Sequence, residues 1–126
     1  MLDYEHREVS MLMVFQSLSV IVALLHIYFL ILEMFLWTKP LGKKVFRMSE
    51  AQAQATKVLA QNQGLYNGFL ATGLLYGVFI HEIHVIVLFL CFVIVAGIYG
   101  SLTASPKTGY VQAIPALITL TMRLFL

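Results

Sequence analysis

Long apolar stretches separated by short charged segments are the main pattern of this chain. Four runs without Asp, Glu, Lys or Arg follow one another, bounded by Glu8 and Glu33, Lys57 and Glu82, Glu82 and Lys107, and Lys107 and Arg123. A helix needs about 20 mostly apolar residues to cross the hydrocarbon core of a bilayer. The first three runs exceed this length, and the fourth reaches it if the side chain of Arg123 extends to the membrane surface.

This pattern predicts an all-α fold, namely a membrane-embedded four-helix bundle in one integral membrane domain of residues 1–126. The expected helices cover residues 10–37, 49–79, 83–104 and 110–126. Pro40 is expected to end the first helix, and residues 40–48 are expected to form a basic turn. Ser49 and Gln52 form a capping-box pattern ahead of a segment rich in helix formers, so the second helix is expected to begin before the membrane and to extend into the cytoplasm.

The composition agrees with lipid as the main solvent of the chain. Hydrophobic residues make up 60% of it and charged residues 11%, against about 25% charged residues in a typical soluble domain. A soluble fold of this size has too little interior to bury so much apolar surface. The net charge of +2 is small and most basic residues lie in one connection, which argues against nucleic-acid binding.

The basic residues are concentrated on one side of the predicted bundle. Six of the eight lie in the first and third connections: Lys39, Lys43, Lys44, Arg47, Lys57 and Lys107. Connections on the cytoplasmic side of a membrane protein carry an excess of Lys and Arg. We therefore expect these two connections in the cytoplasm and both termini outside.

Polar side chains inside the predicted spans gather at one level of the membrane. The candidate ligand-binding residues are Glu33, His26, Asn62, Gln63, Tyr66, Asn67 and Gln112. Counted from the nearest cytoplasmic charge, most of them lie on the order of 8–9 Å inside the membrane edge. His26 is deeper, on the same helical stripe as Glu33, and is a possible proton partner for it.

Two interpretations of this polar layer stay open. In the first, it is a binding site that opens to the cytoplasm, with Glu33 as its carboxylate. In the second, the same residues form hydrogen bonds between helices, each of which stabilises the fold by about 0.6 kcal/mol on average. A carboxylate in hydrocarbon is costly, which favours the site.

Small residues indicate close helix contacts. Gly64 and Gly68, and then Gly73 and Gly77, form two GxxxG pairs on different faces of the second expected helix, and Ala96 and Gly100 form a similar pair on the third. Such residues let helix backbones approach closely. Since four helices were not expected to bury both faces and the polar layer, we predict a homo-oligomer.

The predicted outer turn carries His81, Glu82 and His84. Their spacing differs from that of the H-E-x-x-H zinc motif, so we expect no metal there. The sequence specifies no catalytic residue and no cofactor.

Several segments resemble one family of small bacterial integral membrane proteins. They are HIYF at 26–29, LEMFLW at 32–37, TKVLAQNQGLYNGFLA at 56–71, VAGIYG at 95–100 and QAIPA at 112–116. The family is catalogued as domain of unknown function number thirteen hundred and four, and it has no settled activity. The resemblance implies a multi-pass protein of the bacterial cell membrane.

A weaker similarity, in architecture alone, is to the trimeric membrane enzymes of eicosanoid and glutathione metabolism. It implies a trimer, but the second helix has no Arg or Glu beyond Lys57 to hold glutathione. Three functions therefore remain. The chain binds or passes a small polar or amphipathic molecule through the Glu33 layer, or it is a membrane enzyme of this kind, or it is a structural or partner-binding subunit.

Overall fold

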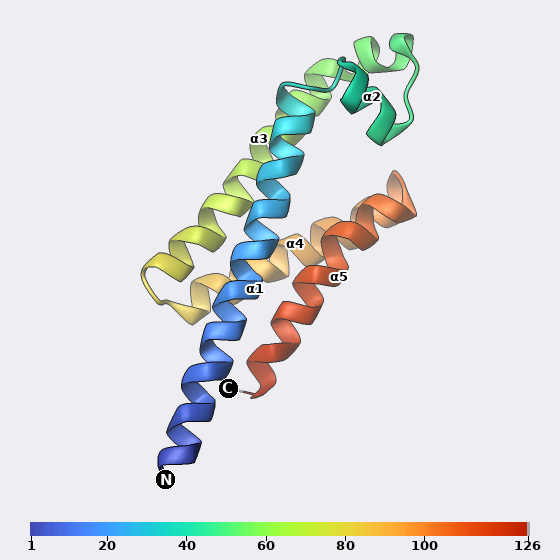
Figure 1. Cartoon of the computed structure of the whole chain (residues 1–126). Coiled ribbons are helices and arrows are strands. Elements are labelled where there is room, and N and C mark those ends of the chain that lie inside the picture. Colours follow the sequence, from blue (N-terminus) through green and yellow to red (C-terminus); the bar gives the residue numbers. More distant parts are fainter. Residues whose placement is uncertain (126) are drawn as a thin grey trace.

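The computed structural model describes residues 1–125, except for the side chain of Thr108, and all regular elements in this range are helical (Figure 1). The α-helices are α1 (Leu2–Met34), α2 (Pro40–Phe46), α3 (Glu50–Phe79), α4 (Ile83–Thr103) and α5 (Pro106–Met122), and a 3-10 turn follows at Arg123–Phe125. The expectation of an all-α fold is confirmed. Leu126, the last residue of the expected fourth helix, lies outside the described residues.

Helix α1 differs from its expected range at both ends. It begins at Leu2, so the charged N-terminal segment is helical, and it ends at Met34, ahead of Trp37. Asp3 and Glu5 lie in its first turn, where the partial positive charge of a helix N-terminus favours acidic side chains.

Two prolines begin helices that were expected to start later or not at all. Pro40 lies in the first turn of α2, a seven-residue helix within the segment expected to be a basic turn. Pro106 has the same position in α5, which begins four residues before the expected start at Tyr110. Proline suits this position because its fixed φ is helical. It lacks an N–H, but an N–H in the first turn would have no acceptor within the helix.

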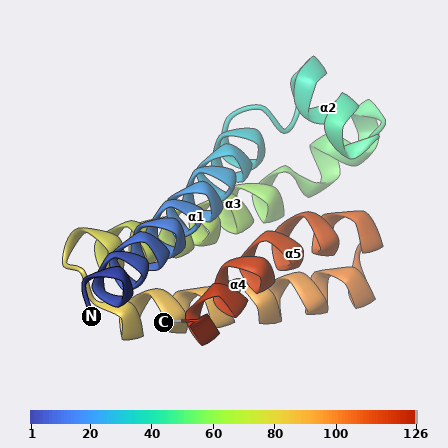
Figure 2. The same ribbon diagram turned by 60° about the horizontal axis from the view of Figure 1, so that its bottom comes forward.

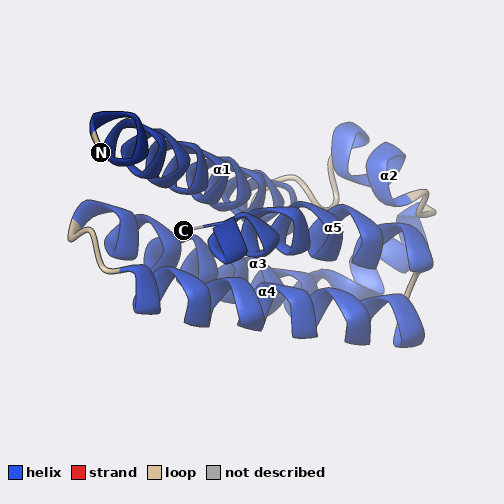
Figure 3. Cartoon of the chain, turned by 90° about the horizontal axis from the view of Figure 1, so that it is seen from below, coloured by secondary structure: helices blue, strands red, loops and turns tan. Residues whose placement is uncertain are grey.

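The helices pack as two antiparallel pairs, α1 with α3 and α4 with α5. Smaller contacts of α3 with α4 and of α1 with α5 join the pairs. Figure 2 shows that both termini and the α3–α4 turn lie at one end of the bundle, whereas α2 and the α4–α5 turn lie at the other. The view from below in Figure 3 shows α5 between α1 and α4.

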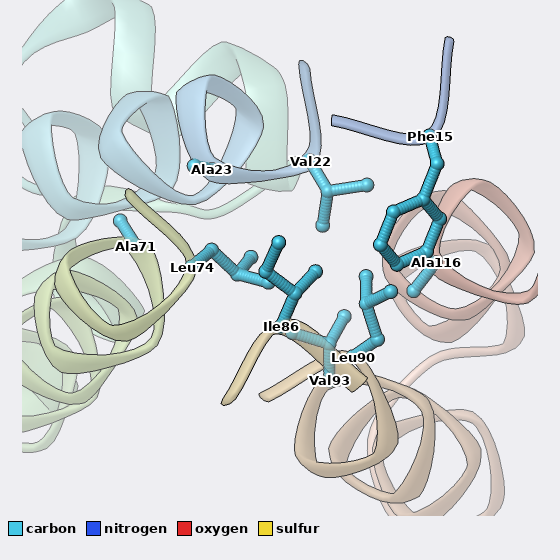
Figure 4. Packing of buried hydrophobic residues seen from close by; sticks show 9 residues of the cluster. All are labelled: Phe15, Val22, Ala23, Ala71, Leu74, Ile86, Leu90, Val93 and Ala116. Atoms are coloured by element: carbon cyan, nitrogen blue, oxygen red, sulfur yellow. The ribbon is translucent and has the colours of Figure 1, made fainter. Parts of the chain in front are cut away.

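An apolar core joins the four long helices (Figure 4). Its buried members are Phe15, Val22, Ala23, Ala71, Leu74, Ile86, Leu90, Val93 and Ala116. The core lies in the half of the bundle away from α2, because its α1 residues precede His26 and its α4 residues belong to the first half of that helix. The other half, near α2, contains the buried polar side chains of Glu33 and Asn67 and two clefts.

Both glycine faces of α3 are buried within the single chain. A Cβ on Gly64 or Gly68 would meet Met34 or Leu30 of α1 at 2.6 or 2.7 Å, and one on Gly73 or Gly77 would meet residues of α4. The glycine faces therefore need no second subunit, whereas Asn62, Gln63 and Tyr66 of the polar layer are exposed. Association into a trimer stays a prediction that must rest on other surfaces.

Helix α2 contacts the segment that follows α1 and the start of α3. The rings of Trp37 and Phe46 lie 4.7 Å apart, and Trp37 Nε1 donates to Thr56 Oγ1 at 3.0 Å. Lys43 donates to Glu50 in an ion pair, and this hydrogen bond holds the pKa of the Glu50 carboxyl below its usual range. The capping box predicted at Ser49 is present in α3.

Two helices, α1 and α4, are long and apolar enough to cross a membrane. This is weak support for a membrane location, because a core helix or a signal sequence can have the same length and composition. Helix α5 has 17 residues, and the amides and glycines of α3 lower its hydropathy. Length and composition therefore support fewer spans than the four expected.

Two glycines of α4 allow a matched test of this packing. A Cβ on Gly97 would lie 2.9 Å from the backbone nitrogen of Ala113 in α5, whereas one on Gly100 would meet nothing within 4 Å. Gly97→Ala should therefore destabilise the fold by about 1–3 kcal/mol, because α5 must move outward. Gly100→Ala should be neutral or slightly stabilising, since alanine favours the helix. Thermal unfolding of both purified variants in detergent would measure this, and equal melting temperatures would contradict the α4–α5 contact.

Candidate functional site

The polar centre of the fold is a hydrogen bond between α1 and α3. Asn67 Nδ2 donates to Glu33 Oε2 at 2.7 Å, and both side chains are buried, at 2% and 7% exposure. Gly64, one turn before Asn67, makes the approach possible, because a Cβ there would lie 3.1 Å from Cβ of Glu33. The pair satisfies a carboxyl group that would otherwise be costly to bury.

A cleft of about 470 Å³ opens beside Glu33. It lies at the α2 end of the bundle and is lined by Glu33, Trp37, Phe46, Thr56, Leu59, Ala60, Gln63, Tyr99, Gly100, Thr103, Ala104 and Gln112. These residues come from all five helices and the segments that join them. The wall therefore combines a carboxyl, two amides and hydroxyls with an apolar surface.

Glu33 lines this cleft, and Asn67 occupies one of its two oxygens. Among the described residues, every fully buried side-chain nitrogen or oxygen has a hydrogen-bond partner. The bond from Asn67 reaches Oε2 only, so Oε1 is not fully buried and can meet a molecule in the cleft. The arrangement can accept a hydrogen bond from a hydroxyl, amide or ammonium group.

The structure brings together only part of the predicted polar layer. Gln63 of α3 and Gln112 of α5 line the cleft with Glu33, as the shared depth predicted. Asn67 lies behind Glu33 and holds it. The convergence of three helices at one level is therefore present in the fold, although ligand binding by these residues stays a prediction.

The other three predicted residues point elsewhere. His26 is buried, with Nδ1 2.8 Å from Val22 O of its own helix. Asn62 is exposed and donates to Val58 O of its own helix, and Tyr66 is 54% exposed. Neither His26, Asn62 nor Tyr66 lines the Glu33 cleft. Asn62 precedes Gln63 and Tyr66 precedes Asn67, and adjacent residues on a helix face directions about 100° apart. His26 is on the same face as Glu33 but about 10 Å further along α1.

Helix α4 contributes residues that the sequence reasoning missed. Tyr99 and Thr103 are one turn apart and line the cleft on either side of Gly100, and Thr103 Oγ1 donates to Tyr99 O. The available signal was this i,i+4 pair of hydroxyl residues around a glycine with open space beside it. Thr56 and Trp37 were also missed, although Trp37 continues the Glu33 stripe.

The residues of the turn between α3 and α4 have structural partners. His81 Nδ1 lies 3.1 Å from Gln16 Nε2 of α1, and Glu82 accepts from the backbone of His84 at the start of α4. Among the described residues, no three His, Cys, Asp or Glu side chains are grouped so that they could hold a metal ion.

A double-mutant cycle would test the Glu33–Asn67 bond. Asn67→Leu alone leaves a buried carboxyl without its donor. Glu33→Leu combined with Asn67→Leu removes both partners, so the double variant should lose less stability than the two single variants added together. We expect a coupling free energy of about 1–2 kcal/mol, above the average for hydrogen bonds between membrane helices. Unfolding by denaturing detergent would measure it. The matched control is Asn62→Leu, which should not couple to Glu33, and equal coupling by both asparagines would contradict the assignment.

Comparison with known proteins places the chain among relatives without an assigned activity. Residues 20–124 match the family described as protein of unknown function (DUF1304). The chain is also 33% identical over 112 residues, or 86% of its length and 94% of the relative's, to the uncharacterized protein YpaA of Lactococcus lactis subsp. lactis (strain IL1403). No solved structure matches the chain. With the family matched over most of its length, the chain belongs to the DUF1304 family.

Proposed function

We propose that this protein is a multi-pass integral membrane protein that binds or passes a small polar or amphipathic molecule through the Glu33 cleft. The observation that carries the proposal is the buried carboxyl of Glu33, which accepts a hydrogen bond from Asn67 on Oε2 and belongs to a residue that lines the cleft. A hydrogen bond between helices alone needs no adjoining cavity. Here the cavity and the carboxyl coincide.

The outward-facing side chains support four crossing helices rather than two. Large apolar residues that do not line the Glu33 cleft are exposed on α3, including Phe69 at 57% and Phe79 at 82%. On α5 the exposed apolar residues are Val111, Ile114, Leu117 and Ile118. Soluble monomers rarely expose continuous apolar surfaces of this size, whereas a lipid-facing helix requires them. Helices α1, α3, α4 and α5 then cross the bilayer in alternating directions.

The ends of the bundle differ in charge, which supports an orientation. Lys39, Lys43, Lys44, Arg47, Lys57 and Lys107 belong to segments at or next to the α2 end (Figure 1). The end with both termini has Asp3, Glu5, Glu8 and Glu82 beside its two arginines. The excess of basic residues assigns the α2 end to the cytoplasm. The Glu33 cleft then opens on the cytoplasmic side.

The walls of the cleft favour a molecule with polar and apolar parts. Glu33, Gln63 and Gln112 offer hydrogen-bond acceptors and donors. Leu59, Ala60 and Phe46 offer apolar surface in the same cleft. Ligand sites commonly combine an apolar wall with a few polar groups that fix orientation.

A topology experiment tests the membrane arrangement. A reporter that is active only in the cytoplasm should be inactive when inserted in the α3–α4 turn and active when inserted beside Arg47. Helix α3 lies between these two positions, so they are on opposite sides only if α3 crosses the membrane. Equal activity at both positions would contradict the four-span arrangement. The reverse pattern would contradict only the orientation.

Occupancy of the cleft can be tested with an uncharged photoreactive amphiphile, a monoacylglycerol bearing a diazirine in its chain. It should label peptides that line the cleft, and Gly100→Leu should reduce this labelling about tenfold, because the new side chain fills space that is open beside Gly100. Mass spectrometry of the labelled peptides would measure it.

Ala96→Leu is the matched control, since Ala96 is exposed on the same helix and does not line the cleft. Labelling spread evenly over the helices, or unchanged by Gly100→Leu, would contradict a bound molecule at this site.

A further inference from the structure

A second cleft lies at the same end of the bundle as the Glu33 cleft. Its volume is about 610 Å³, and it lies between the α1–α2–α3 connection and the α4–α5 turn. Arg47 lines one side and Lys107 the other. Segments far apart in the chain thus bring two cations to a single cavity, which we call the basic cleft.

The two cations have no acidic partner in the described part of the chain. No Asp or Glu lines the basic cleft, and the ion pair found at this end joins Lys43 to Glu50 instead. Arg47 ends α2 with a left-handed backbone, φ 53°, a conformation that favours glycine. The backbone conformation at position 47 favours glycine, so the presence of arginine there indicates that its side chain has a role.

The basic cleft adjoins the Glu33 cleft. Trp37, Phe46 and Ala104 line both of them. A molecule lying across these shared residues would have one end between Arg47 and Lys107 and the other along Leu59 and Ala60. The two cavities therefore match a ligand with an anionic end and an apolar remainder.

We propose that the ligand of this protein is an acidic amphiphile, a phosphate-headed lipid of the membrane leaflet at the α2 end. This rests on the proposed function, and it names the class of molecule that enters the Glu33 cleft. Arg47 offers the planar fork of donors that suits phosphate, and Lys107 adds a point charge opposite it. The groups that follow the head, hydroxyls or esters, then lie near Gln63 and Gln112. A free phosphate ion would leave the apolar part of the adjoining cleft without an occupant.

The test compares two photoreactive amphiphiles with the same diazirine-bearing chain. One has a phosphate monoester head, and the other is the uncharged monoacylglycerol. On the full-length protein in neutral detergent, the phosphate-headed probe should label the Glu33 cleft at about tenfold lower concentration than the uncharged probe. In the double variant Arg47→Gln, Lys107→Gln the two probes should label equally.

The control is the double variant Lys44→Gln, Lys57→Gln, which removes the same charge from exposed residues that line neither cleft. It should keep the tenfold preference. An equal loss in both double variants would mean that the general surface charge attracts the probe, and this would overturn the proposal. Millimolar inorganic phosphate should leave the labelling intact. If it abolishes the preference, the basic cleft is a site for a free anion, and the assignment to a lipid is overturned.

The two proposals fail in different ways. If the uncharged probe does not label the Glu33 cleft, the proposed function is wrong. If it does label the cleft but the phosphate head adds no preference, the proposed function stands and the acidic amphiphile alone is wrong.

Discussion

The burial of one carboxyl group is the constraint on which the α2 half of this bundle depends. Glu33 can be buried because Asn67 donates to it, and Asn67 can reach it because Gly64 lets α1 and α3 approach closely. Replacing Glu33 or Asn67 removes one partner of the hydrogen bond, and replacing Gly64 pushes α1 and α3 apart. The apolar core in the opposite half has no such dependence, since its contacts are made by hydrocarbon side chains of interchangeable chemistry.

This division explains why open space occurs where it does. Near the core, side chains of neighbouring helices occupy the space beside the glycines, as the ring of Phe89 does at Gly73. Near α2, a Cβ on Gly100 would meet nothing within 4 Å. Here a cleft opens between the α1–α3 pair, with Glu33 and Gln63, and the α4–α5 pair, with Gln112. Polar groups that face a cavity can be hydrated or bound by a ligand, whereas the same groups inside a closed contact would each need a partner. The open half therefore suits binding and the closed half suits stability.

The sequence predicted those features that depend on one helix or on spacing along the chain. The distances between charged residues located the long helices, and Ser49 with Gln52 marked the start of α3. A shared depth identified Glu33, Gln63 and Gln112 as neighbours. It could not identify which amide meets Glu33, because that depends on how α1 and α3 are rotated about their axes. The turn with Pro40 was misread because proline both ends one helix and begins the next. His26 was expected to be a proton partner of Glu33. The seven-residue stripe gives the direction of the side chain, but it does not reveal that Nδ1 of the ring lies 2.8 Å from Val22 O of the same helix.

Trp37 is the single tryptophan of the chain, and the structure places it where both clefts meet. Its indole is fixed by the hydrogen bond to Thr56 and by the ring of Phe46. An indole held in this way emits light whose wavelength follows the polarity of its surroundings. Water leaving either cleft, or an apolar chain entering, changes those surroundings directly. The protein thus carries an intrinsic optical reporter at the junction of its two cavities, and it can be read without a label in any membrane or detergent that keeps the fold.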